Sequence, residues 1–206
     1  MAMALCMAVG TWQSPWASGS KSVAYAAETE HEGAIRVTSL EGSSQASFWL
    51  DEAGVPKYQI RYKGKEVVEE SAMGFQVKIQ EEVKEYKDGF TLLGIEESEP
   101  VDATWENPFG DIKTVPDRYQ ETRIKLQAAD GFRFDIICRA YEEGVAFRYA
   151  FPKNAQVPQF QILQELTYFN LDNQATAYAH IGRNQTEVTK IPVTELQAEA
   201  AGYFRP

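Results

Sequence analysis

Residues 139–152 read Arg-Ala-Tyr-Glu-Glu-Gly-Val-Ala-Phe-Arg-Tyr-Ala-Phe-Pro. An apolar segment, Phe132–Cys138, leads into this stretch, and Glu142–Gly144 has the composition of a turn. Alternation at period two then predicts a returning strand with one buried face, which ends at a proline because proline has no N–H to donate to a ladder. The predicted buried side chains are Val145, Phe147, Tyr149 and Phe151. The stretch therefore predicts a hairpin at the centre of an antiparallel sheet.

Similar short apolar or alternating segments recur along the chain, separated by turns that contain Gly or Asp, such as Asp130-Gly131. We expect strands at Ala34–Leu40, Ala46–Leu50, Tyr58–Tyr62, Met73–Ile79, Phe90–Ile95, Tyr119–Ala128, Phe160–Phe169 and Ala175–Ile181. Glu81–Lys87 reads as a charged connector, Gly182–Pro206 is weakly patterned, and no long amphipathic helix is evident. Many short strands at regular spacing predict an all-β protein, an antiparallel β-sandwich.

Composition narrows the class of protein. The chain has 206 residues, 44% of them hydrophobic, and a formal net charge of −10. A chain of this length can bury a substantial core. The negative charge argues against nucleic acid and against anionic membranes as partners, because both attract basic surfaces. Of the two cysteines, Cys6 lies in the N-terminal segment, and Cys138 is expected to be a small buried apolar residue.

The N-terminal segment resembles an export signal. Met1–Gly10 is apolar but too short to span a bilayer, and Ala24-Tyr25-Ala26 is a small-x-small cleavage site that precedes acidic residues. We therefore expect residues 1–26 to be a signal peptide and the mature domain to occupy residues 27–206, in the periplasm or outside the cell. A frayed N-terminus is the alternative.

Val101–Pro116 has no clean period and contains Trp105, Asn107, Pro108 and Phe109. Aromatic side chains in such a loop either pack over one end of the sandwich or face a sugar, on whose rings they stack. Packing is the commoner role of loop aromatics, and we expect it here.

The sequence contains no P-loop, zinc spacing or dinucleotide motif. His31 and His180 are far apart and are expected to be ordinary surface or interface residues. Most acidic residues lie in turns and connectors, but Glu165 lies within an apolar strand segment. Because burial of a lone carboxylate is costly, we expect Glu165 to be paired, with Arg148 or Arg139, or to bind a metal.

Several of these segments together resemble the N-terminal domain of glycoside hydrolase family 97. The hairpin stretch Arg139–Pro152 is the strongest block, although Glu142-Glu143 stands where the family often has aspartates and Cys138 where a larger apolar residue is usual. The other matching positions are Trp105 to Pro108, Gly110, Asp117, Tyr119, Glu121, Phe160, Ile162, Glu165, Thr167 and Phe169. The resemblance covers about Ile35 to Ile181.

The resemblance implies a β-sandwich similar to the galactose mutarotase fold, or supersandwich, which packs on a catalytic (β/α)₈ barrel. Family members are calcium-dependent α-glucosidases or α-galactosidases that act on α-linked oligosaccharides, and the barrel carries their catalytic carboxylates. The resemblance also assigns Glu165 as a calcium ligand. We expect the sandwich to be incomplete at Pro206, and the chain alone to be inactive because glycoside hydrolysis requires a pair of carboxyl groups.

Two other functions are compatible with a β-sandwich. One is a freestanding carbohydrate-binding module that uses Trp105 and its neighbours as a platform. The other is a mutarotase-like epimerase, which requires an acid and a base, commonly histidine with glutamate. Two isolated histidines make the epimerase the weaker alternative.

Overall fold

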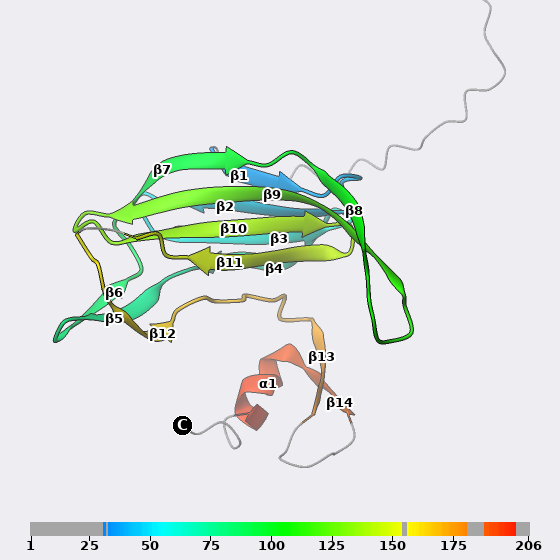
Figure 1. Ribbon diagram of the computed structural model, residues 1–206. Helices are drawn as coiled ribbons and strands as arrows, with labels where there is room; N and C mark the ends of the chain where they lie inside the picture. The colour runs from blue at the N-terminus through cyan, green and yellow to red at the C-terminus, as the bar shows by residue number, and fades with distance from the viewer. Residues whose placement is uncertain (1–30, 32, 154–155, 181–187, 201–206) are drawn as a thin grey trace, which may run out of the picture.

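The computed structural model describes residues 31, 33–153, 156–180 and 188–200, and shows two antiparallel sheets packed face to face (Figure 1). The back sheet has the order β1-β2-β3-β4. Its strands are β1 (Ile35–Thr38), β2 (Ser44–Leu50), β3 (Pro56–Tyr62) and β4 (Lys65–Ala72). The strands are linked by tight turns. Lys63 and Gly64 both have positive φ, 48° and 75°, as a two-residue type I′ hairpin turn requires.

The front sheet has the order β11-β10-β9-β7. Its strands are β7 (Phe90–Glu97), β9 (Thr114–Ala128), β10 (Arg133–Tyr141) and β11 (Gly144–Ala150). The predicted hairpin is confirmed: β10 pairs with β11 from Asp135↔Ala150 to Tyr141↔Gly144. Its predicted place at the centre of the sheet is wrong, because β11 is the edge strand. The Asp130-Gly131 link is also a turn, with φ of 89° at Gly131.

A small third sheet lies at one end of the sandwich and consists of β5 (Phe75–Ile79), β6 (Glu82–Tyr86) and β12 (Gln161–Glu165). The prediction that the charged segment Glu81–Lys87 is a connector is therefore wrong over Glu82–Tyr86, which forms β6 and pairs with β5. Beyond β12 the chain stays hydrogen-bonded to the sandwich as far as Asn170. It then forms β13 (Thr176–His180), β14 (Val188–Pro192) and α1 (Val193–Ala200). The short helix and β4 were not predicted.

The core lies between the two large sheets and is strongly aromatic. Buried side chains from both inner faces include Val37, Phe48, Tyr58 and Ile60 from the back sheet, and Ile124, Leu126, Phe134, Ile136 and Cys138 from the front sheet. Phe75 of the small sheet enters the same core, and its ring makes edge contacts with Phe134, Tyr149 and Phe151 at centroid distances of 5.3, 4.7 and 5.3 Å. Edge-to-face geometry is the preferred arrangement of such rings, so this cluster fixes the small sheet against the sandwich.

Cys138 is fully buried within this core, as predicted. Burial, with a smaller contribution from Glu121, raises the pKa of its thiol to about 12. Among the described residues, no helix is both long and apolar enough to cross a membrane.

Candidate functional site

The segment that carries Glu165 runs across the lower side of the sandwich in Figure 1, beneath the edge strand β11. β12 pairs with β5 in antiparallel register, with Glu165 opposite Phe75. The chain then continues in extended form: Leu166 N donates to Gly74 O and Tyr168 N to Ala72 O, at 2.8 and 2.9 Å. An extended backbone places alternate residues on one face, which here are Glu165, Thr167 and Phe169.

These three residues face the core-side residues of β11 and the back sheet. The hydroxyls of Tyr149 and Thr167 are hydrogen-bonded at 2.6 Å, and the Phe169 ring stacks on Phe147 at 6.1 Å. The buried hydroxyl of Tyr58 donates to the Tyr168 carbonyl at 2.7 Å. We call the set of Tyr149, Glu165, Thr167 and Phe169 the Glu165 surface.

Glu165 itself differs from the sequence-based expectation, because its side chain is exposed at the end of β12. No hydrogen bond or ion pair joins it to another residue in the part of the chain that the structure describes. The pairing expected with Arg139 is wrong, since Arg139 Nε lies 2.6 Å from Glu121 Oε2 instead. Pairing with Arg148 is also not seen, because that side chain is exposed on the outward face of β11, opposite to Phe147. A solvated carboxylate requires no buried partner, which is why the expected ion pair is absent.

The Glu165 carboxylate still influences its surroundings electrostatically. Burial raises the pKa of Tyr58 to about 12, although its hydrogen bond with Ser71 lowers the pKa. The negative charge of Glu165 raises this pKa further. Burial likewise raises the pKa of Tyr149, and Glu165 adds to that shift. Both phenols stay protonated at neutral pH, and their hydroxyls are engaged in the hydrogen bonds with the Tyr168 carbonyl and the Thr167 hydroxyl.

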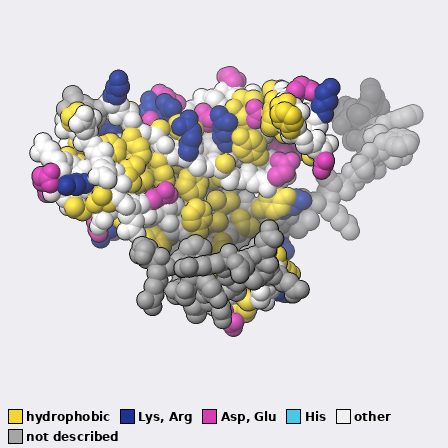
Figure 2. Space-filling view, turned by 60° about the horizontal axis from the view of Figure 1, so that its bottom comes forward, with side chains coloured by type: hydrophobic (Ala, Val, Ile, Leu, Met, Phe, Trp, Pro, Cys, Tyr) yellow, Lys and Arg dark blue, Asp and Glu magenta, His cyan; other side chains and the backbone are white. Residues whose placement is uncertain are grey.

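The lower side of the sandwich is also apolar. Figure 2 brings this side forward and shows hydrophobic side chains gathered across its middle. Residues of the segment that carries Glu165 contribute large exposed groups: Ile162, Leu163, Tyr168 and Phe169, at 45%, 44%, 59% and 59% exposure. Contiguous exposed apolar surface of this kind marks an interaction site in soluble proteins.

The most deeply buried carboxylate of the described chain is a residue that sequence reasoning did not select. Asp135 lies in β10, is 6% exposed, and projects from the outer face of the front sheet. Burial raises its pKa, while Arg123, at 3.8 Å, and Lys125 oppose the increase. Asp135 lies opposite Lys125 in the β9–β10 register, so it belongs to a charge ladder along the sheet. Its position between the apolar residues Phe134 and Ile136 was the available signal.

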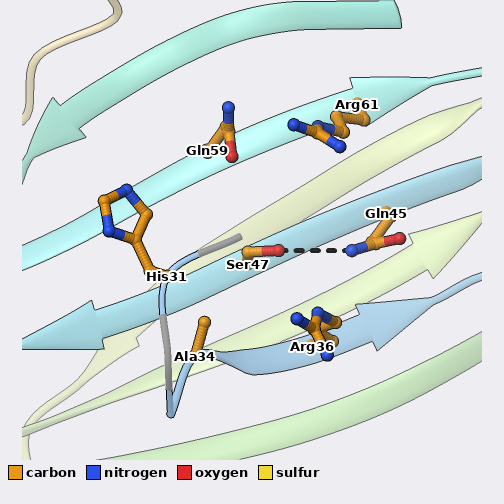
Figure 3. A pocket seen from close by; sticks show the side chains of 7 residues that line it. All are labelled: His31, Ala34, Arg36, Gln45, Ser47, Gln59 and Arg61. Atoms are coloured by element: carbon orange, nitrogen blue, oxygen red, sulfur yellow. Dashed lines mark hydrogen bonds between the residues drawn. The ribbon is translucent and has the colours of Figure 1, made fainter. Parts of the chain in front are cut away.

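The outer face of the back sheet carries a polar pocket (Figure 3). Its side chains rise from β1, β2 and β3, together with His31 and Ala34, and its volume is about 10 Å³. This is room for about one water molecule and not for a sugar ring. His31 stacks on Trp49 at 3.9 Å and lies 3.4 Å from Glu70, on the surface as predicted. A histidine and a glutamate therefore meet here, but the pocket that His31 lines has no room for an epimerase substrate.

A second, apolar pocket of about 210 Å³ opens between the two sheets. Ile35, Phe48, Leu92, Ile124 and Ile136 contribute to its walls. Lys57 is its titratable group, and Lys57 Nζ is held by Glu70 at 2.5 Å and by Asp51 at 3.5 Å. The pocket can accept an apolar group but has no free acid or base for catalysis.

The aromatic segment around Trp105 is also not as expected. It forms β8 (Val101–Glu106), which pairs with the first half of β9, and Trp105 and Phe109 are 50% and 86% exposed. The prediction that these aromatics pack over the end of the sandwich is therefore wrong for the described part of the chain. The sequence did carry a signal for this strand, because Val101, Ala103 and Trp105 alternate with Asp102, Thr104 and Glu106.

The fold and this surface define a β-sandwich domain with an exposed carboxylate on an apolar side, and comparison with known proteins specifies its family. Residues 37–206 match the family model described as Glycosyl-hydrolase 97 N-terminal. The chain thus belongs to glycoside hydrolase family 97 and contains its N-terminal domain, as the hairpin stretch indicated.

Individual relatives agree with this assignment. The chain is 29% identical over 170 residues to a "Probable retaining alpha-galactosidase" of Streptomyces bingchenggensis, a match that covers 79% of this chain and 25% of the relative. It is similar to a family 97 enzyme of Pseudoalteromonas sp. strain K8, solved with panose as an E480Q variant, at 26% identity and a TM-score of 0.68. The same enzyme solved with acarbose gives 25% identity and the same TM-score.

Both structural matches cover 77% of this chain and 24% of the solved chain. A β-arabinopyranosidase structure shares the fold at 22% identity and a TM-score of 0.62. The chain spans about a quarter of the length of the curated relative and of the family 97 enzyme.

Proposed function

We propose that this chain is the N-terminal accessory domain of an exported, calcium-dependent α-glycosidase, either an α-glucosidase or an α-galactosidase, that acts on α-linked oligosaccharides. The family match over residues 37–206 carries the proposal. Support for the substrate class comes from the relative named as an alpha-galactosidase and from the family 97 structures with panose and acarbose.

In this proposal the catalytic pair of carboxylates belongs to a (β/α)₈ barrel on which the sandwich packs. Glycoside hydrolysis uses two carboxyl groups that flank the scissile bond. The Glu165 surface supplies one exposed carboxylate, the hydrogen-bonded hydroxyls of Tyr149 and Thr167, and a broad apolar surround. Such a surface is suited to form one wall of a site whose reacting groups are supplied by a partner domain.

Calcium fits the Glu165 surface only as a shared ion. Calcium takes six to eight oxygen ligands at about 2.3–2.6 Å. Among the described residues, no three side chains of the His, Cys, Asp and Glu types are grouped to hold a metal. Glu165 is exposed and unpaired within the described chain, so it can serve as one ligand while the barrel supplies the others. When bound, calcium would supply positive charge that holds the barrel carboxylates in place.

Export is part of the proposal and rests on the residues 1–26 leader, which lies outside the described residues. The N-terminal sequence of the secreted mature protein tests it. A first residue at Ala27 is the expected result, and retention of Met1 in the mature protein would contradict it.

The calcium role of Glu165 is tested in the longer polypeptide that contains this chain. Glu165→Gln keeps the shape of the side chain but removes its charge, so calcium affinity and turnover of nitrophenyl α-glucoside or α-galactoside should both fall. The melting temperature without calcium should be unchanged, because the exposed carboxylate has no partner to lose. Glu97→Gln, an exposed carboxylate at the end of β7, is the matched control.

Calorimetric calcium titration and melting curves of the wild type and both variants, measured at one pH, distinguish a calcium ligand from a residue with no role in the site. Unchanged calcium affinity in Glu165→Gln would remove this residue from the site. A full-length protein without activity on either substrate class would contradict the proposed reaction.

A further inference from the structure

The first half of β9 leaves the sandwich and forms a two-stranded ribbon with β8 (Figure 1). β9 pairs with β10 from Gln120 onward and with β7 from Thr122 onward. Before those positions, Thr114–Tyr119 pairs with β8 alone. A two-stranded ribbon is marginally stable in water unless one of its faces is covered. We call Val101–Tyr119 the ribbon.

The ribbon has two chemically different faces. Residues directly opposite in an antiparallel pair share a face. One face carries the pairs Asp102↔Arg118 and Glu106↔Thr114. These side chains interact with one another: Arg118 Nε lies 3.0 Å from Asp102 Oδ1 in an ion pair, and the Thr114 hydroxyl donates to Glu106 at 2.9 Å. This face needs no further partner.

The other face is apolar and exposed over most of its length. It carries the pairs Trp105↔Val115 and Ala103↔Asp117, and it ends at Tyr119. Tyr119 is buried at the base of the ribbon, where the Arg139 guanidinium lies 4.1 Å from its ring centroid. Away from the base, Trp105 is 50% exposed. The connecting turn adds Phe109 and Ile112 at 86% and 65% exposure.

We propose that the apolar face of the ribbon, centred on Trp105 with Phe109 and Ile112 at its tip, is a docking arm for the polypeptide that family members carry beyond this domain. This inference rests on the proposed function, since it names the surface through which the sandwich engages its partner domain. The complementary surface is an apolar cup that receives the indole and phenyl rings, with a cation placed to face Asp117.

The occupant follows from lengths and positions. The chain spans about a quarter of its family relatives, so most of such a protein lies outside this domain. The ribbon descends on the lower side of the sandwich, the side on which β13, β14 and α1 also lie (Figure 1). The ribbon therefore reaches toward the region into which the chain itself leads.

Charge disfavours the other occupants. The sequence from Val101 to Arg118 contains four acidic residues and two basic ones, and the whole chain carries −10. A second copy of this chain would bring like charge against the ribbon, and nucleic acid or an anionic membrane would do the same. A partner domain with cations around an apolar cup meets no such repulsion.

Hydroxyl-radical footprinting of the full-length protein tests the inference on the wild-type molecule. Docking predicts that Trp105 and Phe109 are labelled far more slowly than expected for side chains that are 50% and 86% exposed, as they are in this domain. Trp105→Ala should then raise the labelling of Phe109 by about tenfold or more, the loss expected when a central aromatic anchor of an interface is removed. Thr104→Ala, on the polar face of the same strand, is the matched control and should leave labelling unchanged.

The outcomes separate this inference from the proposed function. Fast labelling of Trp105 in a full-length protein that hydrolyses α-glycosides would overturn the docking arm and leave the function intact. Protection that depends on protein concentration would overturn it in favour of a second copy. Protection that appears only when panose is added would overturn it in favour of a sugar platform. Concentration-independent protection without glycosidase activity would support the arm and contradict the function. The labelling of the wild-type protein decides the test by itself. Fast labelling of Trp105 therefore overturns the inference even if the Trp105→Ala variant fails to fold.

Discussion

The turn of the β10–β11 hairpin makes a testable connection between the two sheets. Glu142 follows β10, and its carboxylate accepts hydrogen bonds from Ser39 Oγ at 2.9 Å, Glu41 N at 2.6 Å and Ser43 N at 3.4 Å. These three donors belong to the turn between β1 and β2 in the back sheet. Next to them, the Ser44 hydroxyl donates to the Tyr141 carbonyl. One carboxylate therefore joins turns that are about a hundred residues apart in sequence.

Glu142→Gln removes the charge while keeping the size of the side chain. A hydrogen bond to a charged group contributes about 1.5–3 kcal/mol when it is well buried. Glu142 is only half-buried, so water compensates part of the loss, and the shortest bond is to an exposed backbone amide. The expected loss is about 1–2 kcal/mol in total, which lowers the melting temperature of a chain of this size by about 2–8 °C.

The pH dependence gives a second signature. Although burial opposes the shift, the hydrogen bonds from Glu41, Ser39 and Ser43 lower the pKa of Glu142 from its ordinary value of 4.5. A lowered folded-state pKa stabilises the fold above the unfolded value, and this stabilisation is lost as the pH falls through the folded value. The difference between wild type and Glu142→Gln should therefore be constant at neutral pH, begin to shrink as the pH falls toward 4.5, and disappear only below the lowered pKa of the folded state.

Urea denaturation of the 206-residue chain, followed by tryptophan fluorescence at neutral and acidic pH, measures both signatures. Glu143→Gln is the control, because Glu143 is the adjacent residue, has the same charge and is exposed. Equal stability losses in the two variants, or a Glu142→Gln loss that persists in acid, would refute the link between the sheets.

Two further predictions concern the core. Phe75→Ala should lower the free energy of unfolding by about 3–5 kcal/mol in the same urea assay, because it removes a buried ring at the junction with the small sheet. The control is Val83→Ala in the neighbouring β6, where Val83 is 53% exposed; it should change this free energy by less than about 0.5 kcal/mol. Similar losses in both variants would contradict the assigned packing. In a Cys6→Ser background, Cys138 should resist a thiol-specific disulfide reagent at mildly alkaline pH until the chain unfolds, because burial raises the pKa of its thiol to about 12. Rapid labelling of the folded chain would show that the core between the sheets is open.

The sequence was sufficient for the strands whose side chains alternate between core and solvent. Val145, Phe147 and Tyr149 repeat at period two, and their partners in β10 are apolar, so the hairpin could be placed from local pattern alone. The family could also be identified from this stretch, because its residue pattern is specific and the other matching segments lie before and after it in the expected order. Strands such as β4 and β6 were missed because their residues are mostly charged and exposed, and only pairing with β3 and β5 makes them strands.

The environment of each carboxylate depended on the tertiary structure. In sequence, Glu165 and Asp135 both lie among apolar residues, yet Glu165 is solvent-exposed at a strand end and Asp135 is buried beneath its cationic neighbours. Trp105 and Phe109 likewise had the composition of a packed loop but project on a ribbon. Local sequence determines which residues alternate and where the chain turns. Exposure, by contrast, depends on which strands lie above and beside a residue, and those neighbours come from distant parts of the chain that only the folded sheets bring together.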